Sequence, residues 1–382
     1  MPLNESQREW LTLALVPGVG TTLFIRLLAR FKTPGDVLRA SEAALEEVVG
    51  NNLAQRIRQY KEFVDLEGQV RDIDKYNVQF ITLDDPAYPL RLAEIYDPPL
   101  ALFTRGETHE SDRYCVAIVG TRGATGYGLR MAERLGAELA ARGITVVSGM
   151  AQGIDTAAHR GALSSGGRTI AVLGCGVDVV FPAENADLMH QIIQHGCVMS
   201  PFPMGMKALK GNFPQRNRII SGLSLGTIVV EAPPGSGALI TARHAAEQGR
   251  EVFAVPGQAG QRNSMGPHSL IREGAKLVET VEDVLTELDL PAASRQPSPS
   301  PEKPPQPASA PEHVPAPKQH VPEPVVSETE KDILASLSTD GSFVDEIAAV
   351  CRISISEALS SLTMLELKGL VRQFSGKRFA PR

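Results

Sequence analysis

The sequence predicts an α/β fold: an extended, Rossmann-like and mostly parallel sheet, flanked by an N-terminal helical domain and a C-terminal winged helix. Two observations predict the sheet. Across the middle of the 382-residue chain, short segments that are apolar throughout alternate with amphipathic segments, which is typical of parallel strands covered by helices. Nearly all of the apolar segments end in Gly or Ser, where backbone can approach a ligand at the carboxyl ends of the strands.

The predicted elements follow one another in regular order. The apolar segments predicted as strands are residues 115–120, 145–149, 168–174, 197–200, 226–232 and 251–257. The amphipathic segments predicted as helices between them are residues 126–141, 154–163, 183–195, 216–221 and 238–248. Because the strands are apolar throughout, we expect helices on both faces of the sheet.

Composition divides the chain into four segments. Residues 1–80 contain short helical patterns separated by glycines, and residues 81–289 carry the sheet. Residues 290–325 are rich in Pro, Ala, Ser, Glu and Lys, so they bury too little apolar surface to offset the entropy of ordering, and we expect a disordered linker there. Residues 326–382 show three helical patterns and then a strand–turn–strand pattern, which is typical of a winged helix.

Both flanking segments have features of DNA-binding folds. Residues 17–20, PGVG, join two helical patterns, as in helix-hairpin-helix and sterile-alpha-motif-like folds, whose backbone amides can meet a DNA phosphate. Few cations flank this turn, so a packing or protein-contact role is equally supported. The predicted wing is basic, but the predicted recognition helix lacks cations. Non-specific DNA or a protein partner therefore fits the C-terminal segment better than sequence-specific reading of a major groove.

Charge and cysteine spacing exclude several classes of site. The formal net charge is -6, so a phosphate site must be a local basic patch. None of the four cysteines stands in a C-x-x-C pair, so no zinc site is expected. The N-terminal residues lack the pattern of a signal peptide, and no apolar run reaches membrane-spanning length. We therefore expect a cytoplasmic protein that is not inserted into a membrane.

The turns after the strands argue against the common nucleotide cofactors. After the first predicted strand the sequence is GTRGATGYG, not G-x-G-x-x-G, and the second strand is followed by no acid for a ribose hydroxyl, which argues against NAD. The chain contains no G-x-x-x-x-G-K-[ST] motif, so P-loop hydrolysis of ATP is disfavoured. We expect no cofactor and no metal.

Candidate catalytic groups are sparse. Four histidines fall on predicted helices without an evident Cys or Ser partner: His159, His190, His195 and His244. Three acids follow predicted strands: Asp155, Asp178 and Glu231. A lone acid at a strand end more often caps a helix or orients a loop than it catalyses. No catalytic residue is predicted.

Three elements at the strand ends suit phosphate. Residues 120–123, GTRG, combine backbone amides, a hydroxyl and a guanidinium. Residues 148–153, SGMAQG, lead into a second predicted helix. Residues 207–218, KALKGNFPQRNR, carry Lys and Arg within a longer stretch that has no acid. The net charge of the chain is negative, so this last segment is a local patch of positive charge.

Phe213 lies among these cations, and two interpretations of it remain open. An aromatic ring beside Lys and Arg offers single-stranded nucleic acid both a stacking surface and phosphate contacts, and stacking contributes about 1–3 kcal/mol per base. Alternatively, Phe213 is a core residue and Arg216 or Arg218 pairs with Glu231. The residues alone support both interpretations equally.

Eight ordered motifs resemble one family. They are VAIVGTR (116–122), GYG (126–128), SGMAQGID (148–155), AVLGCGVD (171–178), FPQRNRIISGLS (213–224), VVEA (229–232), SGALITARHAAEQGREVFAVPG (236–257) and LIREGA (270–275). In this order they resemble the DNA processing protein A (DprA/Smf) family across essentially the whole sheet domain. The flanking helical and winged-helix domains are also similar to those of the longer members.

The resemblance implies a function and partners. Members of the family are not known as enzymes. They bind single-stranded DNA during natural transformation, protect it from nucleases and from single-strand-binding protein, help to load the RecA recombinase, and form homodimers. It implies DNA contacts by Arg122, Lys210 and Phe213. Together with the residues that suit phosphate, the predicted DNA-binding residues are Gly120, Thr121, Arg122, Ser148, Gly149, Lys210, Phe213, Arg216, Asn217 and Arg218. The implied dimer interface contains Leu270, Ile271 and Leu277.

The sequence departs from the family pattern at two places. Family members usually have S-E-x-P after the fourth strand of the sheet, whereas residues 200–203 are SPFP and lack the acid. His268 stands where an Asn usually precedes the Leu-Ile pair. Both segments adjoin predicted site residues.

Two other functions are considered. Residues 233–245, PPGSGALITARHA, faintly resemble the P-G-G-x-G-T-x-x-E motif of nucleotide-processing phosphoribohydrolases, but the final Glu is absent. A transcription regulator acting through the winged helix would require sequence preference, and the cation-free recognition helix disfavours it.

Overall fold

The computed structural model describes residues 3–288, 290, 327–338, 342–368, 370–374 and 378–381. The chain divides into two compact units, Met1–Glu302 and Lys303–Arg382. Apart from Leu290, the predicted linker lies outside the described residues.

Between residues 3 and 78, all of them described, the chain forms α-helices joined by short turns, as predicted. They are α1 (Glu5–Leu15), α2 (Thr21–Phe31), α3 (Pro34–Arg39), α4 (Glu42–Val49), α5 (Asn51–Arg58) and α6 (Leu66–Lys75). Local sequence fixes their starts, because Asn4, Thr33, Ser41 and Asp65 each accept a backbone N–H of the first turn that would otherwise lack a partner.

The mostly parallel sheet is confirmed. In the described part of the first unit it has nine strands in the order β1-β2-β6-β5-β4-β3-β7-β8-β9. The six predicted strands are present as β3 (Cys115–Val119), β4 (Thr145–Ser148), β5 (Thr169–Val172), β6 (Cys197–Ser200), β7 (Gly226–Val229) and β8 (Glu251–Ala254). Neighbours among these six pair in parallel. Three strands were not predicted: β1 (Gln79–Thr82) and β2 (Ala101–Gly106), which add antiparallel, and the edge strand β9 (Lys276–Leu277).

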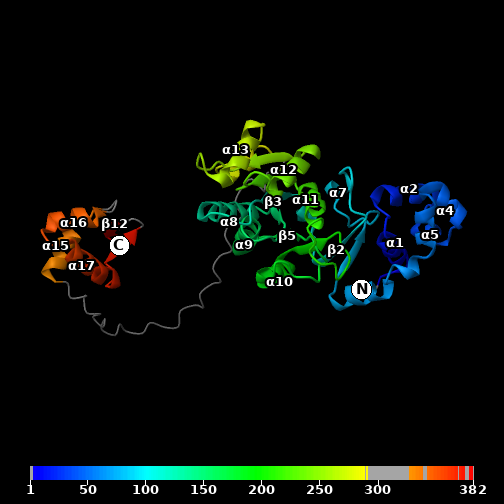
Figure 1. Ribbon diagram of the computed structural model, residues 1–382, viewed down its shortest axis with the longest axis horizontal. Coiled ribbons are helices and arrows are strands. Elements are labelled where there is room, and N and C mark those ends of the chain that lie inside the picture. The colour runs from blue at the N-terminus through cyan, green and yellow to red at the C-terminus, as the bar shows by residue number, and fades with distance from the viewer. Residues whose placement is uncertain are drawn as a thin grey trace, which may run out of the picture. The chain divides into compact units, whose positions relative to one another are not determined.

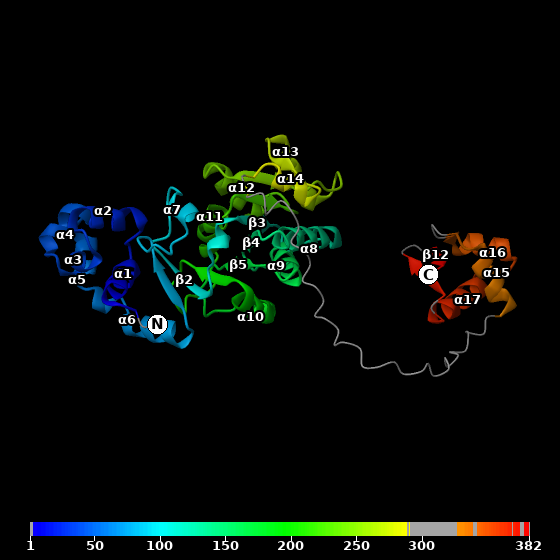
Figure 2. The ribbon, with the colours of Figure 1, turned by 180° about the vertical axis from the view of Figure 1, so that it is seen from behind.

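Helices cover both faces of the sheet (Figure 1 and Figure 2). Val116 and Ile118 of β3 pack with α8 (Gly126–Ala140), α9 (Ile154–Ser164) and α14 (Val281–Leu285). Ala117 and Val119, which alternate with them, face α11 (Asn212–Leu223) and α12 (Gly237–Glu247). The remaining helices of this unit are α7 (Leu90–Ala93), α10 (Ala186–His195) and α13 (Met265–Arg272).

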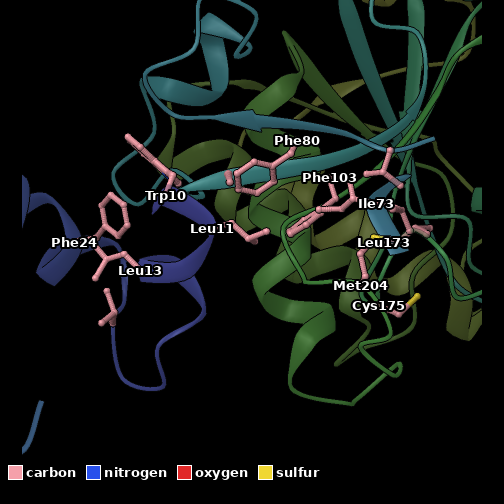
Figure 3. Packing of buried hydrophobic residues seen from close by; sticks show 14 of the residues in the cluster. Trp10, Leu11, Leu13, Phe24, Ile73, Phe80, Phe103, Leu173, Cys175 and Met204 are labelled. Carbon is pink, nitrogen blue, oxygen red and sulfur yellow. The ribbon is translucent and has the colours of Figure 1, made fainter. Parts of the chain in front are cut away.

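The N-terminal helices share a core with one end of the sheet. The buried cluster runs from Trp10 and Phe24 through Phe80 and Phe103 to Leu173 (Figure 3). Trp10 Nε1 donates to the carbonyl of Leu100 at 3.0 Å, and Gln7 Nε2 donates to the carbonyl of Phe80 in β1 at 3.1 Å. The helices therefore belong to the same packed body as the strands, and α1 occupies the β1 edge.

The second unit has the predicted winged-helix order. Its described elements are α15 (Glu328–Ser336), β10 (Ser342–Phe343), α16 (Val344–Cys351), α17 (Ile355–Leu367), β11 (Val371–Phe374) and β12 (Arg378–Pro381). The three predicted helices are present, and the sheet order is β10-β12-β11. Ile333, Ile347, Leu362 and Phe379 form its separate core. Strand β10 was not predicted, since it is only two residues long.

Candidate nucleic-acid interface

The candidate site lies where the order of the parallel strands reverses. Strand β3 pairs with β4 on one side and with β7 on the other. The chain runs from β3 through β4 and β5 to β6 in one direction, and then resumes at β7 and continues to β8 in the other. Loops that leave the carboxyl ends of β3 and β7 therefore diverge and open a crevice.

The loop after β3 presents Arg122. Gly120 must be glycine, because a Cβ there would lie 2.4 Å from the Ile154 side chain. The backbone N–H of Thr121 donates to the carbonyl of Glu231 at 2.7 Å, which ties this loop to the end of β7. Arg122 is exposed, and its guanidinium lies over the Phe213 ring with 5.4 Å between Cζ and the ring centroid.

Arg216 reaches the same point from helix α11. Its buried guanidinium donates from Nη2 to the carbonyl of Gly149 at 3.0 Å and from Nη1 to Asn217 Oδ1 at 3.2 Å. A Cβ on Gly149 would lie 1.8 Å from Nη1 of Arg216, so only glycine leaves room for the guanidinium. Asn217 Nδ2 in turn donates to the carbonyl of Gly237 at 3.1 Å, which joins α11 to the start of α12.

The buried charge of Arg216 lies near a buried carboxylate. Asp155 Oδ2 accepts the backbone N–H groups of Gly149 at 3.2 Å and Ala151 at 3.4 Å. Burial raises the pKa of Asp155, and the nearby positive charge of Arg216 opposes that rise. Burial lowers the pKa of Arg216, and Asp155 opposes that change in turn. Both groups stay within a polar network that holds the turn after β4.

Phe213 lies in the first turn of α11 between the two arginines. The Arg216 guanidinium carbon is 5.9 Å from the ring centroid. A Cβ on Gly174, at the end of the β5 segment, would lie 2.9 Å from the ring, so the ring packs directly against backbone. A second aromatic, Phe181, has its ring centroid 5.8 Å from that of Phe213.

Two cavities in the described part of the chain meet at this cluster. One, of about 330 Å³, extends toward the loop between β7 and α12, residues 233–237. The other, of about 390 Å³, extends toward Phe181 and the loop after β5. The two cavities share a wall formed by Arg122, Ala151, Phe213 and Arg216. This wall combines an aromatic ring with two cations, as both stacking and phosphate binding require.

Most of the predicted DNA-binding residues line these cavities. The residues that line at least one of them are Gly120, Thr121, Arg122, Gly149, Phe213, Arg216 and Asn217. Lys210 is exposed and precedes α11 outside both linings. The other two lie apart: Ser148 is buried and donates its hydroxyl to the carbonyl of Ile118 at 2.6 Å, and Arg218 pairs with Asp97 at 3.3 Å.

The alternative interpretation of the arginines is wrong. Among the described side chains Glu231 pairs with neither Arg216 nor Arg218. It accepts the Thr125 N–H at 2.9 Å and the Asn263 amide at 3.3 Å, and so holds the start of α8. Asp178 likewise binds the backbone N–H of Gly205, at 2.9 Å from Oδ1. These acids orient turns and helix starts, as expected for lone acids at strand ends.

Asp178 also contacts residues 200–205, the segment in which the acid of the family's S-E-x-P pattern is missing. Ser200 donates its hydroxyl to the carbonyl of Cys175 at 2.6 Å and accepts the Phe202 N–H at 3.0 Å. Together with the bond from Gly205 to Asp178, these contacts hold residues 200–205 against the loop after β5. A carboxylate from that loop therefore fastens the segment in which the family acid is missing.

His159, one of the histidines on the predicted helices, is bonded to a strand. His159 is buried, its Nδ1 lies 2.7 Å from Thr169 Oγ1, and Thr169 donates its hydroxyl to the carbonyl of Val146. Since that hydroxyl proton is used, His159 Nδ1 carries the proton between the two atoms. Burial, together with the nearby positive charge of Arg216, lowers the pKa of His159 to about 3. Within the described ranges, no three His, Cys, Asp or Glu side chains converge as metal ligands.

Phe181 and residues 233–237 were missed as site residues. Phe181 lies far from Phe213 in the sequence, and only the path of the loop after β5 brings the two rings together. The signal available in the sequence was an aromatic residue that shortly follows a predicted strand, and the structure shows it to be exposed. Residues 233–237 appeared only in the faint resemblance to phosphoribohydrolases.

The predicted dimer residues lie at the other edge of the sheet. Leu270 and Ile271 are half-buried on α13, and Leu277 is 46% exposed on β9. Met265, at the start of α13, is 50% exposed.

No helix in the described part of the chain is long and apolar enough to cross a membrane.

Comparison with known proteins identifies the family. The family model described as DNA recombination-mediator protein A matches residues 79–289, and that of the DprA winged helix domain matches residues 299–377. The chain is 36% identical to Protein Smf of Synechocystis over 99% of this chain and 100% of that protein. It is 47% identical to DNA processing protein DprA of Streptococcus pneumoniae over 55% of this chain and 74% of that protein.

Solved structures agree with the sequence comparison. The X-ray structure of DprA from Streptococcus pneumoniae matches with a TM-score of 0.66 and 36% identity, covering 76% of this chain and 100% of that chain. DprA from Helicobacter pylori, whose structure is described for its single-stranded DNA binding mode, matches with a TM-score of 0.50 and 30% identity over 55% of this chain and 97% of that one. The chain therefore belongs to the DNA recombination-mediator protein A (DprA/Smf) family.

Proposed function

We propose that the chain is a cytoplasmic protein that binds single-stranded DNA at the crevice between β3 and β7. The observation that carries this proposal is the cluster of Phe213 with Arg122 and Arg216, whose shared wall separates two cavities at the strand ends. Stacking surfaces beside cations are what a single strand requires, since its bases have free faces and its phosphates are charged. The structure of the relative from Helicobacter pylori is described for its single-stranded DNA binding mode.

Each predicted residue has a role consistent with its position. Arg122 is exposed and available to a phosphate, and Lys210 is exposed where the strand approaches α11. Phe213 offers its ring to a base. The backbone at Gly120 and Thr121 borders the same cavity. A further group acts by positioning: Ser148, Gly149, Asn217 and Arg218 hold β3, the turn after β4 and helix α11 in place.

The wider role proposed here follows the family. The chain binds single-stranded DNA that enters the cell during natural transformation, protects it, and helps to load the RecA recombinase in exchange with single-strand-binding protein. It acts as a homodimer through α13 and β9, where Leu270, Ile271 and Leu277 lie. A dimer presents two DNA sites, so a strand long enough to reach both binds with avidity. No catalytic step is assigned.

Equilibrium binding tests the DNA site. Fluorescent single-stranded and duplex oligonucleotides are titrated with the wild type and with the Arg122→Ala/Lys210→Ala variant. Contacts to about three phosphates give a log–log salt slope near -2 for a single strand, and loss of two cations reduces its size by about 1.4. The matched control is Arg130→Ala/Arg160→Ala, which removes two exposed arginines outside both cavities.

The outcomes distinguish the crevice from the other candidate DNA-binding sites of the chain. Weaker binding and a smaller slope only in the Arg122→Ala/Lys210→Ala variant support the crevice. Unchanged binding moves the DNA site to the basic wing or to the turn at residues 17–20. Turnover of a nucleoside monophosphate by the wild type would instead favour the phosphoribohydrolase reading.

A further inference from the structure

The larger of the two cavities has no assigned occupant. Phe181 and Phe213 both line it, with 5.8 Å between their ring centroids, and Gly174 and Cys175 complete this part of the wall. Phe181 is 41% exposed although it is a large apolar side chain, and its ring is tilted by 42° from that of Phe213. An exposed aromatic that lines a cavity beside cations is suited to stack on a flat, uncharged ring of a charged polymer.

The shared wall links this cavity to the first one. Arg122, Phe213 and Arg216 line both cavities, so the two occupants are separated by one aromatic ring and by two guanidinium groups. Two nucleobases joined by a phosphodiester match this arrangement, with each base in its own cavity and the connecting phosphate near the arginines. Two unconnected, uncharged molecules would place no anion beside the exposed Arg122.

We propose that Phe181 is a second base-stacking residue, so that consecutive nucleobases of one strand occupy the two cavities with Phe213 inserted between them. The proposal rests on the DNA site proposed above and extends it by one nucleotide. A ring inserted between neighbouring bases requires them to be unstacked, and duplex DNA resists unstacking at a cost of a few kcal/mol per step. The inserted Phe213 ring would thereby make the site select single strands over duplex DNA.

Polar groups at the rim of this cavity can meet the edge of the second base. Gln152 and Glu184 are exposed and line the cavity. The stacking surface itself is indifferent to base identity, since every base has a π face. The proposal therefore concerns a stacking site and not sequence readout.

The test uses the full chain and abasic oligonucleotides. A length series first gives the shortest oligothymidylate that keeps full affinity, so that the strand binds in one register. Single abasic residues are then placed at each position. In the wild type we expect two adjacent positions at which loss of the base weakens binding by about 5- to 150-fold, the factor that corresponds to stacking of one base.

Phe181→Ala identifies the second of these positions. We expect it to weaken binding of the unmodified strand by a similar factor and to abolish the abasic penalty at one position while the neighbouring penalty remains. Phe181→Tyr should restore both. Phe63→Ala is the matched control, because Phe63 is 48% exposed and lies in the turn between α5 and α6, outside the lining of the cavity.

The two proposals fail in different ways. Wild-type protein that does not bind single strands overturns the DNA site itself and this proposal with it. If the wild type binds single strands and Phe181→Ala shows the same abasic penalties as the wild type, only the role of Phe181 is overturned. Equal weakening by Phe181→Ala and Phe63→Ala also contradicts it, because the loss then reflects general damage to the fold.

Discussion

Two glycines decide where the candidate DNA-binding side chains lie. Gly149 gives the Arg216 guanidinium its place against the turn after β4, and Gly174 lets the Phe213 ring lie on backbone. Neither glycine has a positive φ, so their value lies in the missing Cβ and not in backbone freedom. The geometry of the site therefore depends on residues that offer a ligand no side chain.

Gly149→Ala tests this dependence. The new methyl group would lie 1.8 Å from Nη1 of Arg216, so the guanidinium must leave its place. We expect single-strand affinity to fall about as far as in Arg216→Ala, and the double variant to be little worse than either single one, because both remove the same placed guanidinium. Fluorescence titration of the three variants measures this.

A neutral site provides the control for this cycle. Gly20→Ala adds a methyl group that meets nothing within 4 Å, so its affinity should match the wild type. Fully additive losses in the Gly149→Ala/Arg216→Ala variant would mean that the two positions act separately.

The local sequence pattern predicted Arg122, Phe213 and Arg216. An aromatic residue and arginines are suited to bases and phosphates, and this can be recognised before the fold is known. Pattern could not separate Arg216 from Arg218. Positions two apart on a helix point in different directions, and so Arg216 meets the turn after β4 whereas Arg218 meets Asp97. Phe181 was out of reach for a similar reason, since its role depends on where a loop ends.

At the scale of elements, a buried histidine joins α9 to the strands beneath it. His159 of α9 bonds Thr169 of β5, and Thr169 bonds the carbonyl of Val146 in β4. In the folded protein the pKa of His159 is about 3, against an ordinary value of 6.5. This imidazole is therefore neutral in the fold at every physiological pH.

The lowered pKa predicts a specific loss of stability in acid. Between pH 6.5 and about 3 the unfolded chain binds a proton at His159 that the folded chain does not, so the free energy of unfolding falls as the pH falls. One such group contributes about 1.4 kcal/mol per pH unit in this window. We expect His159→Asn to have a correspondingly shallower pH dependence from pH 6.5 to 5, measured by urea denaturation.

The slope is the readout, since His159→Asn also opens a cavity and lowers stability at neutral pH. His190→Asn, on the exposed side of α10, should keep the wild-type slope. Parallel curves for wild type and His159→Asn would show that another group controls the response to acid.

The central strands were predictable and the added ones were not. Strands β3 to β7 are buried along their whole length, so their sequences are mainly apolar, with only Ser and Thr as polar residues. Strand β9 is two exposed residues, and its sequence, Lys-Leu, has no recognisable period. Strand β1 begins with an exposed Gln and follows the helices with which it shares a core. Edge strands of this kind can be recognised only once the strands or helices that they pack against have been placed.

At the scale of the whole molecule, the first unit contains everything that the proposed DNA site needs. The three hydrophobic clusters around the sheet and both cavities lie within residues 3–290, and the winged helix has its own core. We expect a chain that ends at Glu302 to keep its circular dichroism and its affinity for short single strands within a factor of about two, since no packing contact of the site is removed. A tenfold loss would assign part of the DNA site to the winged helix.

The proposed dimer face gives a further prediction. Leu277 is half-exposed on β9, and a charge there would be unpaired in an apolar interface. Leu277→Glu should sediment as a monomer, bind short oligonucleotides as the wild type does, and lose the avidity for long ones. Ile25→Glu on α2, at 48% exposure, should leave the oligomeric state unchanged. A dimeric Leu277→Glu protein would move the interface elsewhere.

The contact between Gln7 and the carbonyl of Phe80 has a consequence for how many partners the sheet can have. A sheet with two bare edges can accept a neighbour at each, and such chains can grow into filaments. Here α1 supplies a side chain to the backbone of β1, so that border is already occupied by the chain itself. The opposite border is β9, two residues long. We therefore expect a second copy to add along the strand-pairing direction at the β9 border and not at the β1 border.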